Sequence, residues 1–235
     1  MKRLILALLT MLVLTGTVCA APAKYVALTF DDGPSGNNTE ALLEMLQERE
    51  VKATFFLCGY RMETYPELVG KLREAGHELG VHGYSHTCFD VLCREELQKE
   101  LQGTADQIRE FGGTQPVLLR PPCGAWNESV RETAREAGLT VILWSADSLD
   151  WQGGEAEDMA QRVCDQAKNG DIILMHDMYA YSVEAAAQII DRLREQGFTF
   201  VTVSELAELA DCTMQPGDVF SQFSGAHAPN QGTVP

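Results

Sequence analysis

The sequence predicts an α/β protein with a parallel sheet, and two observations lead to this fold class. Short runs rich in β-branched and aromatic residues alternate with longer runs of helical periodicity along most of the 235 residues. Polar clusters follow five of the predicted strands, and the carboxyl ends of parallel strands meet on one face. The alternation by itself leaves open whether the sheet is doubly wound or closed into a barrel.

The elements follow one another as seven βα units. The first strand runs into a turn rich in Asp, Gly, Pro and Asn. The helix that starts near residue 38 carries Leu46 four and three residues after Leu42 and Leu43. The predicted strands are 26–30, 53–57, 78–81, 116–119, 140–144, 171–175 and 198–202. The predicted later helices are 63–75, 94–111, 128–137, 156–167, 183–196 and 203–210. Residues 212–235 lack periodicity, so we expect a domain over 21–211 and then a tail or loose cap.

The first 20 residues have the order of a secretory signal peptide. Lys2 and Arg3 precede an apolar run, and small residues follow up to Ala23. We expect cleavage after Ala20 and a mature protein that is secreted or held at the cell surface or cell wall. The apolar run is short for a membrane span, and an uncleaved anchor is the alternative.

Composition and charge exclude several functional classes. The chain is 45% apolar and 22% charged, which is ordinary for a globular protein and excludes collagen-like and fully disordered chains. It carries 34 acidic and 18 basic residues, a net charge of −16. Such a surface repels phosphate backbones, so we expect no nucleic-acid partner and no long-range attraction to an anionic membrane.

The cysteines bear on the compartment of the protein. Six remain after the signal peptide, an even number that allows up to three disulfides in an exported protein. Cys88 and Cys93 are close in sequence, and we predict that they form a disulfide under oxidising conditions. Buried free thiols are the alternative. The absence of a Cys-x-x-Cys pair argues against a cysteine zinc site.

Two of the five histidines point to a metal. His82 and His86 are four residues apart just after the third predicted strand, so one helical turn would let both imidazoles share an ion. A polar turn with two solvated imidazoles is the alternative. His77 lies in a Gly-His-Glu turn and is predicted to be structural, and His227 falls in the tail.

Charged residues also follow the ends of other predicted strands. Asp31 and Asp32 are adjacent at the end of the first, where like charges raise each other's pKa unless a metal or a guanidinium compensates. A simple Asp/Gly/Pro turn is the alternative. Further polar clusters at strand ends are 120–124, 147–151 and 174–177. Scattered turn polarity would fall on both faces, so this gathering predicts a functional site at the carboxyl ends of the strands.

In these clusters the chain resembles the NodB-type polysaccharide deacetylases, carbohydrate esterase family 4. The similarity runs from about residue 25 to 209 and covers five motifs in order, at 29–34, 82–86, 120–124, 147–151 and 174–176. Gly83 stands where the family usually has Ser or Thr, and Cys123 where an aromatic residue is common. The resemblance implies a distorted (β/α)7-type barrel, the NodB homology domain, that hydrolyses N-acetyl groups of N-acetylglucosamine-containing glycans.

The resemblance also implies a metal site. Asp32, His82 and His86 would hold one divalent ion and leave positions open for water and substrate, as catalytic sites do. Zinc suits these ligands, with cobalt, nickel, iron or manganese as alternatives.

The remaining roles are carried over in the same way. Asp31 would be the general base, oriented by Arg120, and His176 would be the general acid, with Asp150 as its partner. The oxyanion and substrate-binding residues would be Cys123 through its backbone N–H, Trp126, Trp151 and Leu174. Trp126 and Trp151 could stack on sugar rings.

Two other functions stay open. A non-catalytic glycan-binding module of this fold should lack the base or the acid, whereas Asp31 and His176 are both present. A glycosidase would use paired carboxylates without the Asp/His/His trio. Peptidoglycan is the expected substrate because exported single-domain members fit that role, and chitin oligomers and acetylxylan are alternatives. We expect the protein to be a monomer.

Overall fold

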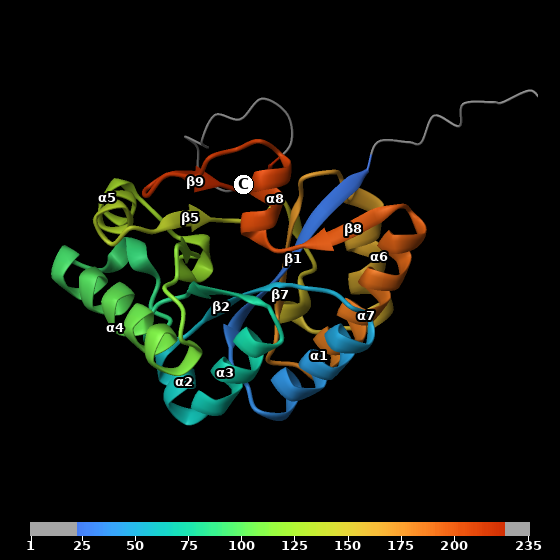
Figure 1. The fold of residues 1–235 in the computed structure, drawn as a ribbon, viewed down its shortest axis with the longest axis horizontal. Helices are drawn as coiled ribbons and strands as arrows, with labels where there is room; N and C mark the ends of the chain where they lie inside the picture. Colours follow the sequence, from blue (N-terminus) through green and yellow to red (C-terminus); the bar gives the residue numbers. More distant parts are fainter. Residues whose placement is uncertain (1–22, 224–235) are drawn as a thin grey trace, which may run out of the picture.

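A computed structural model describes residues 23–223 as one curled sheet with helices on its outer side (Figure 1). Its strands are β1 (Lys24–Gly33), β2 (Thr54–Leu57), β3 (Glu78–Val81), β4 (Leu118–Leu119), β5 (Thr140–Ile142), β6 (Ala146–Asp147), β7 (Ile172–His176), β8 (Phe198–Val201) and β9 (Val219–Phe220). The order in the sheet is β6-β7-β1-β2-β3-β4-β5-β9, and β8 pairs with the beginning of β1.

All the ladders between these strands are parallel. Within the described chain no ladder joins β6 to β9, so the sheet curls into an incomplete barrel. The predicted α/β class and the distorted (β/α)7-type barrel are confirmed. Because every strand runs the same way, the carboxyl ends of β1, β3, β4 and β7 open on one face.

The helices are α1 (Asn37–Glu48), α2 (Gly59–Thr64), α3 (Pro66–Glu74), α4 (Arg94–Gly112), α5 (Glu128–Glu136), α6 (Ala156–Gln166), α7 (Ala180–Glu195) and α8 (Val203–Leu209). Three short 3₁₀ turns are η1 (Phe89–Val91), η2 (Pro122–Gly124) and η3 (Asp150–Gln152). Local chemistry sets several of the ends. The Asn127 side chain accepts from the Val130 N–H to cap α5, and Gly113 ends α4 in the left-handed conformation.

The region predicted as one helix over 63–75 is two. Tyr65 has φ −134° and ψ 56°, outside the helical region, and Pro66 follows at the first position of α3. A residue before proline is disfavoured in the helical region, so the chain bends here and starts again.

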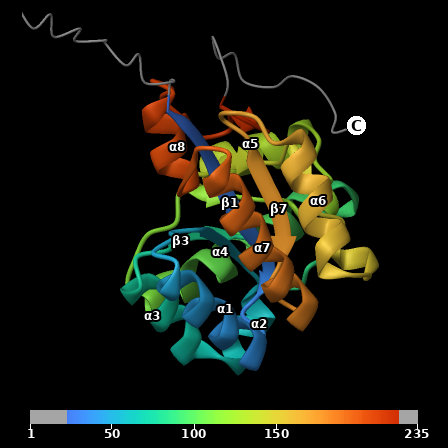
Figure 2. The same cartoon turned by 90° about the vertical axis from the view of Figure 1, so that its right-hand side faces the viewer.

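Two apolar layers hold the barrel together. Val26, Leu28 and Phe30 on one side of β1 belong to the large core between the sheet and the helices. Ala27, on the other side, belongs to a smaller cluster inside the barrel that includes Phe56. Since side chains alternate along a strand, Asp31 follows Ala27 into the barrel interior. Figure 2 shows α7 packed over β1 and β7, with α1 and α6 on its two sides.

The predicted tail is in part a strand. β9 pairs in parallel with β5, and the rings of Phe220 and Phe223 stack with centroids 5.0 Å apart. The domain therefore does not end at residue 211, because these buried aromatic residues close the interior of the barrel. The predicted signal peptide and His227 lie outside the described residues.

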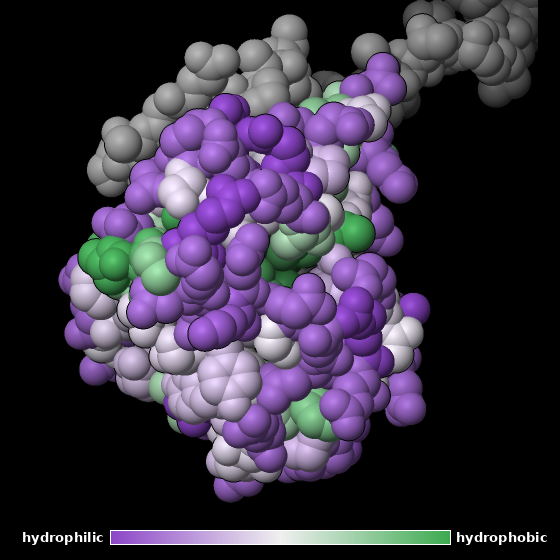
Figure 3. Space-filling model, turned by 90° about the vertical axis from the view of Figure 1, so that its left-hand side faces the viewer, coloured by the Kyte–Doolittle hydropathy of each residue, from purple (hydrophilic) through white to green (hydrophobic). Residues whose placement is uncertain are grey.

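The surface agrees with the acidic composition. Figure 3 shows the side of the molecule that carries α4 and α5 as mainly hydrophilic, with small apolar patches. Within residues 23–223, no helix combines the length and the apolar character that a membrane span requires.

Candidate active site

A bulge in β1 separates the two neighbouring aspartates. Asp31 pairs in register with Phe56 of β2 and His176 of β7, and the register with β2 shifts between Asp31 and Gly33. Asp32 is the extra residue, with a left-handed φ of 72°. A bulge turns one side chain away from the alternation of the strand. Asp31 therefore contacts Arg120 and Asp32 contacts His86, although the two aspartates are adjacent in sequence. His82 Nε2 approaches both, at 3.7 Å from Asp31 Oδ2 and 3.2 Å from Asp32 Oδ1.

Arg120 is fully buried and holds Asp31. Its Nη1 donates to Asp31 Oδ1 at 2.7 Å and to Thr29 Oγ1 at 2.7 Å. Its Nε and Nη2 donate to the backbone carbonyls of Ile142 and Leu143 at 3.1 and 2.9 Å. A buried charge needs such pairing, and the rigid guanidinium fork binds one Asp31 oxygen. The other oxygen, Oδ2, makes no contact with Arg120 and lies 3.7 Å from His82 Nε2.

Asp32, His82 and His86 form a compact trio at the ends of β1 and β3. One ligand atom from each lies within 4.8 Å of the others. Asp32 Oδ1 is 3.2 Å from His82 Nε2 and 2.9 Å from His86 Nε2. His82 is 2% exposed, and its Nδ1 lies 2.7 Å from the carbonyl oxygen of Arg120. A carbonyl only accepts, so Nδ1 carries the proton, and a neutral His82 presents a lone pair at Nε2.

An unsatisfied buried oxygen within the trio indicates that it fits a cation. Asp32 Oδ1 is buried and has no hydrogen bond of good geometry, although two imidazole nitrogens are close to it. Burial raises the pKa of Asp32, but the close approach and the charge of His82 and His86 outweigh burial and lower it overall. The proximity of Asp32 likewise raises the pKa of His86. An ionised carboxylate facing imidazole nitrogens is the donor set of a divalent metal with open positions.

His176, at the end of β7, is paired with a buried carboxylate. Asp150 accepts from the His176 ring Nδ1 at 2.7 Å, from the His176 backbone N–H at 2.8 Å and from Ser182 Oγ at 2.6 Å. Burial of His176 lowers its pKa, but the hydrogen bond to Asp150 and the nearby charges of Asp31 and Asp32 raise it to about 9. The imidazole is therefore protonated at neutral pH.

Cys123 lies in η2 and is disulfide-bonded. It forms a disulfide with Cys88, with the two Cα atoms 6.0 Å apart. The predicted Cys88–Cys93 disulfide is wrong, since Cys93 is a free, exposed residue at the N-cap of α4. Proximity in sequence does not bring Cβ atoms together, whereas the barrel places the loops after β3 and β4 side by side. The backbone N–H of Cys123 has no hydrogen-bond partner within the described chain.

The sequence matches a known family. The model of the family described as polysaccharide deacetylase fits residues 20–142, which include Asp31, Asp32, His82, His86 and Arg120. The chain belongs to the polysaccharide deacetylase family. This confirms the resemblance to the NodB-type enzymes.

Relatives of the chain have named activities. Peptidoglycan-N-acetylmuramic acid deacetylase PdaC of Bacillus subtilis is 39% identical over 186 residues, which are 79% of this chain and 39% of PdaC. A peptidoglycan-N-acetylglucosamine deacetylase of Bacillus cereus is 38% identical over 188 residues, 78% of this chain and 88% of that protein. The chain thus spans well under half of PdaC and most of the second enzyme.

Solved structures of the family share the fold. The structure of B. subtilis PdaC superposes with a TM-score of 0.77 at 38% identity and covers 81% of this chain and 93% of that one. A family 4 acetyl xylan esterase from Clostridium thermocellum, in complex with a cobalt ion, superposes with a TM-score of 0.79 at 29% identity. It covers 85% of this chain and 98% of that one.

Gly83 has a steric reason to depart from the family pattern. Its φ is +82°, and a Cβ at this position would lie 2.9 Å from the Phe89 ring and 3.2 Å from Glu100 Oε2. Both the left-handed backbone and the close ring disfavour the usual Ser or Thr. In this chain the turn between His82 and His86 is instead tied by Glu100, which accepts from the Tyr84 and Ser85 N–H groups at 2.6 and 2.8 Å.

The predicted substrate-binding residues are spread around the site. Leu174 is 4% exposed on β7, and its neighbours Ile173 and Met175 belong to the outer core while it does not. It therefore faces the barrel interior, as Asp31 does. Trp151 in η3 is 53% exposed and available for contact, whereas Trp126 is partly buried against the outer core.

Asp177 is a residue of this region that carries no predicted role. It is fully buried and accepts from Thr39 Oγ1 at 2.5 Å, and its Oδ1 has no hydrogen-bond partner among residues 23–223. Burial raises its pKa to about 7. A Cβ on Gly33 would lie 2.3 Å from Asp177 Oδ2, so the glycine after the aspartate pair permits this approach. In the sequence, the only sign of Asp177 is its position directly after His176, and its burial depends on the fold.

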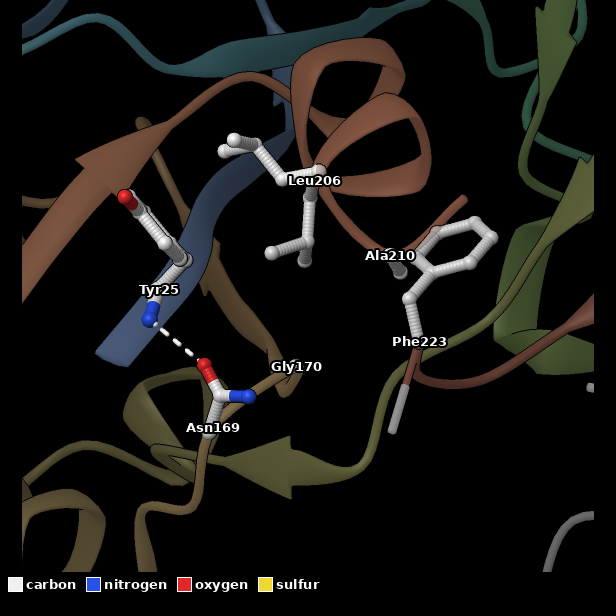
Figure 4. A pocket seen from close by; sticks show the side chains of 7 residues that line it. Tyr25, Asn169, Gly170, Leu206, Ala210 and Phe223 are labelled. Carbon is white, nitrogen blue, oxygen red and sulfur yellow. Dashed lines mark hydrogen bonds between the residues drawn. The ribbon is translucent and has the colours of Figure 1, made fainter. Parts of the chain in front are cut away.

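A pocket at the opposite end of the barrel does not belong to this site (Figure 4). It lies where β1 begins, and Figure 4 shows Tyr25, Asn169, Leu206 and Phe223 around it. The Tyr25 N–H donates to Asn169 Oδ1 at 2.7 Å. Its lining has no acid, base or metal-ligating cluster, so the chemistry of the chain lies at the carboxyl ends of the strands.

Proposed function

We propose that this chain is a metal-dependent polysaccharide deacetylase that hydrolyses N-acetyl groups of amino sugars in peptidoglycan. The observation that carries the proposal is the gathering of a metal-type trio, a carboxylate held by a buried arginine and a protonated histidine at one end of the barrel. Each of these groups has a distinct task in amide hydrolysis, and no one of them would be required by a binding module.

Asp32, His82 and His86 would hold the divalent ion. When bound, such an ion polarises a carbonyl and lowers the pKa of a coordinated water. The carbonyl of Arg120 orients the His82 ring so that Nε2 faces the site. Zinc is the first candidate for this nitrogen and oxygen set, with cobalt, nickel, iron or manganese as alternatives.

Asp31 is the proposed general base. Arg120 occupies Oδ1, which leaves Oδ2 to accept a proton from the attacking water. As the new carbon–oxygen bond forms, the electron pair of the acetyl carbonyl moves to its oxygen. The unpaired N–H of Cys123 would donate to that oxyanion, and such a donor is typically worth a factor of about 10²–10³ in rate.

His176 is the proposed general acid. An amine is a poor leaving group, so the nitrogen must receive a proton as the carbon–nitrogen bond breaks. Asp150 binds Nδ1–H and keeps the ring charged, and the other ring nitrogen is then the proton donor. The products are acetate and a free amino sugar.

The relatives support the choice of polymer. The named sequence relatives act on N-acetylglucosamine or N-acetylmuramic acid of peptidoglycan. We therefore place the activity outside the cell at the wall, in line with the predicted signal peptide. Trp151 offers an exposed ring for sugar stacking beside Asp150, and Leu174 an apolar wall for the acetyl methyl group.

Acetate release from three polymers tests the proposal. Purified peptidoglycan, chitin oligomers and acetylxylan are incubated with the metal-loaded chain, and acetate, free amines and new reducing ends are measured. We expect equal acetate and amine from peptidoglycan, no reducing ends, and loss of activity with a chelator. New reducing ends that resist the chelator would show a glycosidase, and no product from any polymer would favour a binding module.

A further inference from the structure

The disulfide joins the two loops that carry the proposed ligand and the proposed oxyanion donor. Cys88 comes two residues after His86, and Cys123 comes three residues after Arg120. The bond links positions 35 residues apart in sequence, across the gap between the loops that follow β3 and β4. It is the only disulfide among the described residues.

The segment around His86 has few other attachments. Before it, Glu100 fixes the Tyr84 and Ser85 N–H groups, and after it Phe89 is buried in the core. Among the described residues, the segment 86–88 takes part in one hydrogen bond, between the hydroxyls of Thr87 and Ser85. The remaining links are the approach of His86 to Asp32, its ring contact with His82 and the disulfide. His86 also has a left-handed φ of 62°, which a non-glycine residue keeps only when its surroundings hold it.

Cys123 is held in a similar way. Its φ and ψ are 61° and 7°, again left-handed, and its own N–H makes no hydrogen bond with any residue that the structure describes. The neighbouring N–H groups of Gly124 and Ala125 close the turn onto Pro121 and Pro122 at 3.0 and 3.1 Å. The disulfide therefore holds Cys123 in place through its side chain, while its N–H has no partner among the described residues.

We propose that the Cys88–Cys123 disulfide is a positioning element that holds His86 and the Cys123 N–H in the site together. This inference rests on the proposed function, because it assumes that His86 binds the metal and that Cys123 binds the oxyanion. Cleaving the bond frees both left-handed residues to relax toward ordinary backbone conformations. Metal affinity and turnover then fall together, and the chain reaches full activity only in an oxidising compartment.

The bond is accessible enough to be tested in the folded protein. Cys123 is exposed and Cys88 is half-buried. A dithiol reductant would supply two electrons and two protons, become a cyclic disulfide itself, and leave Cys88 and Cys123 as thiols. The reductant is then removed under anaerobic conditions so that it does not compete for metal.

The central experiment compares the double variant Cys88→Ser/Cys123→Ser with Cys93→Ser. The control removes a free, exposed cysteine that can be replaced at an N-cap, where Ser is favoured. Metal affinity is measured by competition with a chromophoric chelator, and kcat and KM are measured on peptidoglycan fragments. We expect the metal affinity of the double variant to fall about 10–100-fold, the range for mutations of groups that orient a metal ligand. We also expect its kcat to fall with little change in KM. The control should match the wild type.

Reduced wild-type protein provides the same comparison without substitution, and it replaces the double variant if that variant does not fold. A double variant or reduced protein with wild-type metal affinity and kcat would overturn the inference, even if its melting temperature fell. Absence of acetate release by the oxidised wild type would instead contradict the proposed function. In that case the metal affinities still decide whether the disulfide positions His86.

Discussion

Asp31 and Arg120 form a buried ion pair inside the barrel, with Asp31 Oδ1 2.7 Å from Arg120 Nη1 and side chains 4% and 0% exposed. The pair brings together residues 89 positions apart. Arg120 also spans the barrel, since its other nitrogens bind carbonyls at the end of β5 and just beyond it. The Arg120 side chain thus orients the proposed base, Asp31, and also joins β1 to the end of β5.

Arg120→Lys should destabilise the fold as well as slow the reaction. An ammonium can keep the charge next to Asp31, but it cannot also reach the carbonyls of Ile142 and Leu143. Each buried acceptor left unpaired costs about 1–3 kcal/mol, so denaturant unfolding should show a loss of several kcal/mol. Arg94→Lys, at an exposed ion pair, is the control and should change stability by less than about 0.5 kcal/mol. Equal stability of the two variants would argue against the structural role of Arg120.

His82→Ala should remove the metal. Loss of the Nε2 ligand leaves only Asp32 and His86, too few to retain an ion against dialysis. Elemental analysis of the dialysed protein should find about one ion per wild-type chain and none in the variant. His77→Ala is the control, because His77 is also buried but accepts from the Ala53 N–H far from the trio. Full metal occupancy in His82→Ala would exclude the proposed ligand set.

The pKa of His176 should set the alkaline limit of activity. The folded value of about 9 lies above the usual 6.5, so the stabilisation from the charged pair is complete below about pH 6.5 and is lost as the pH rises through about 9. Asp150→Asn removes the carboxylate whose hydrogen bond and charge raise the pKa of His176, and we expect this pKa to fall toward 6.5. NMR titration of the metal-free protein and the pH dependence of kcat/KM should both move to lower pH. An unchanged alkaline limit would show that another group donates the proton.

Gly83→Ala should be more harmful than a matched change elsewhere. Gly83 and Gly113 both have a left-handed φ, but only at Gly83 would a Cβ meet a ring, that of Phe89 at 2.9 Å. Both variants should lose about 1 kcal/mol or more from backbone strain, and Gly83→Ala should lose further stability and weaken metal binding next to His82. Thermal unfolding and chelator competition measure the two effects. Equal losses in the two variants would mean that the ring moves aside at no cost.

Much of the fold was predictable because its patterns are local. The alternation of strands and helices and the polar residues at strand ends depend on periodicity and turn chemistry, and the structure confirms the parallel barrel. The break at Tyr65 and Pro66 has a signal in the sequence, the proline, although helical periodicity alone predicts one helix over 63–75. The strand Val219–Phe220 was missed because two residues carry no periodicity, and the barrel alone offers them a partner.

The site was predictable as a set of motifs, and its contacts were not. Asp32, His82 and His86 converge as the resemblance implied. The Cys88–Cys123 bond, the bulge at Asp32 and the burial of Asp177 depend on which loops the barrel brings together. Proximity in sequence favours Cys93 as the disulfide partner of Cys88. In the fold, however, the loop after β3, which carries Cys88, lies beside the loop after β4, which carries Cys123.

The division of work between the two neighbouring aspartates is tested most directly by turnover per bound metal in Asp31→Asn, with Asp32→Asn beside it. We predict that Asp31→Asn keeps about one ion per chain and a normal KM while kcat falls by on the order of 10²–10⁴, the range for loss of a general base. Asp32→Asn should lose metal and activity together. Near-normal turnover in Asp31→Asn, or metal lost from Asp31→Asn and kept in Asp32→Asn, would contradict the proposed roles.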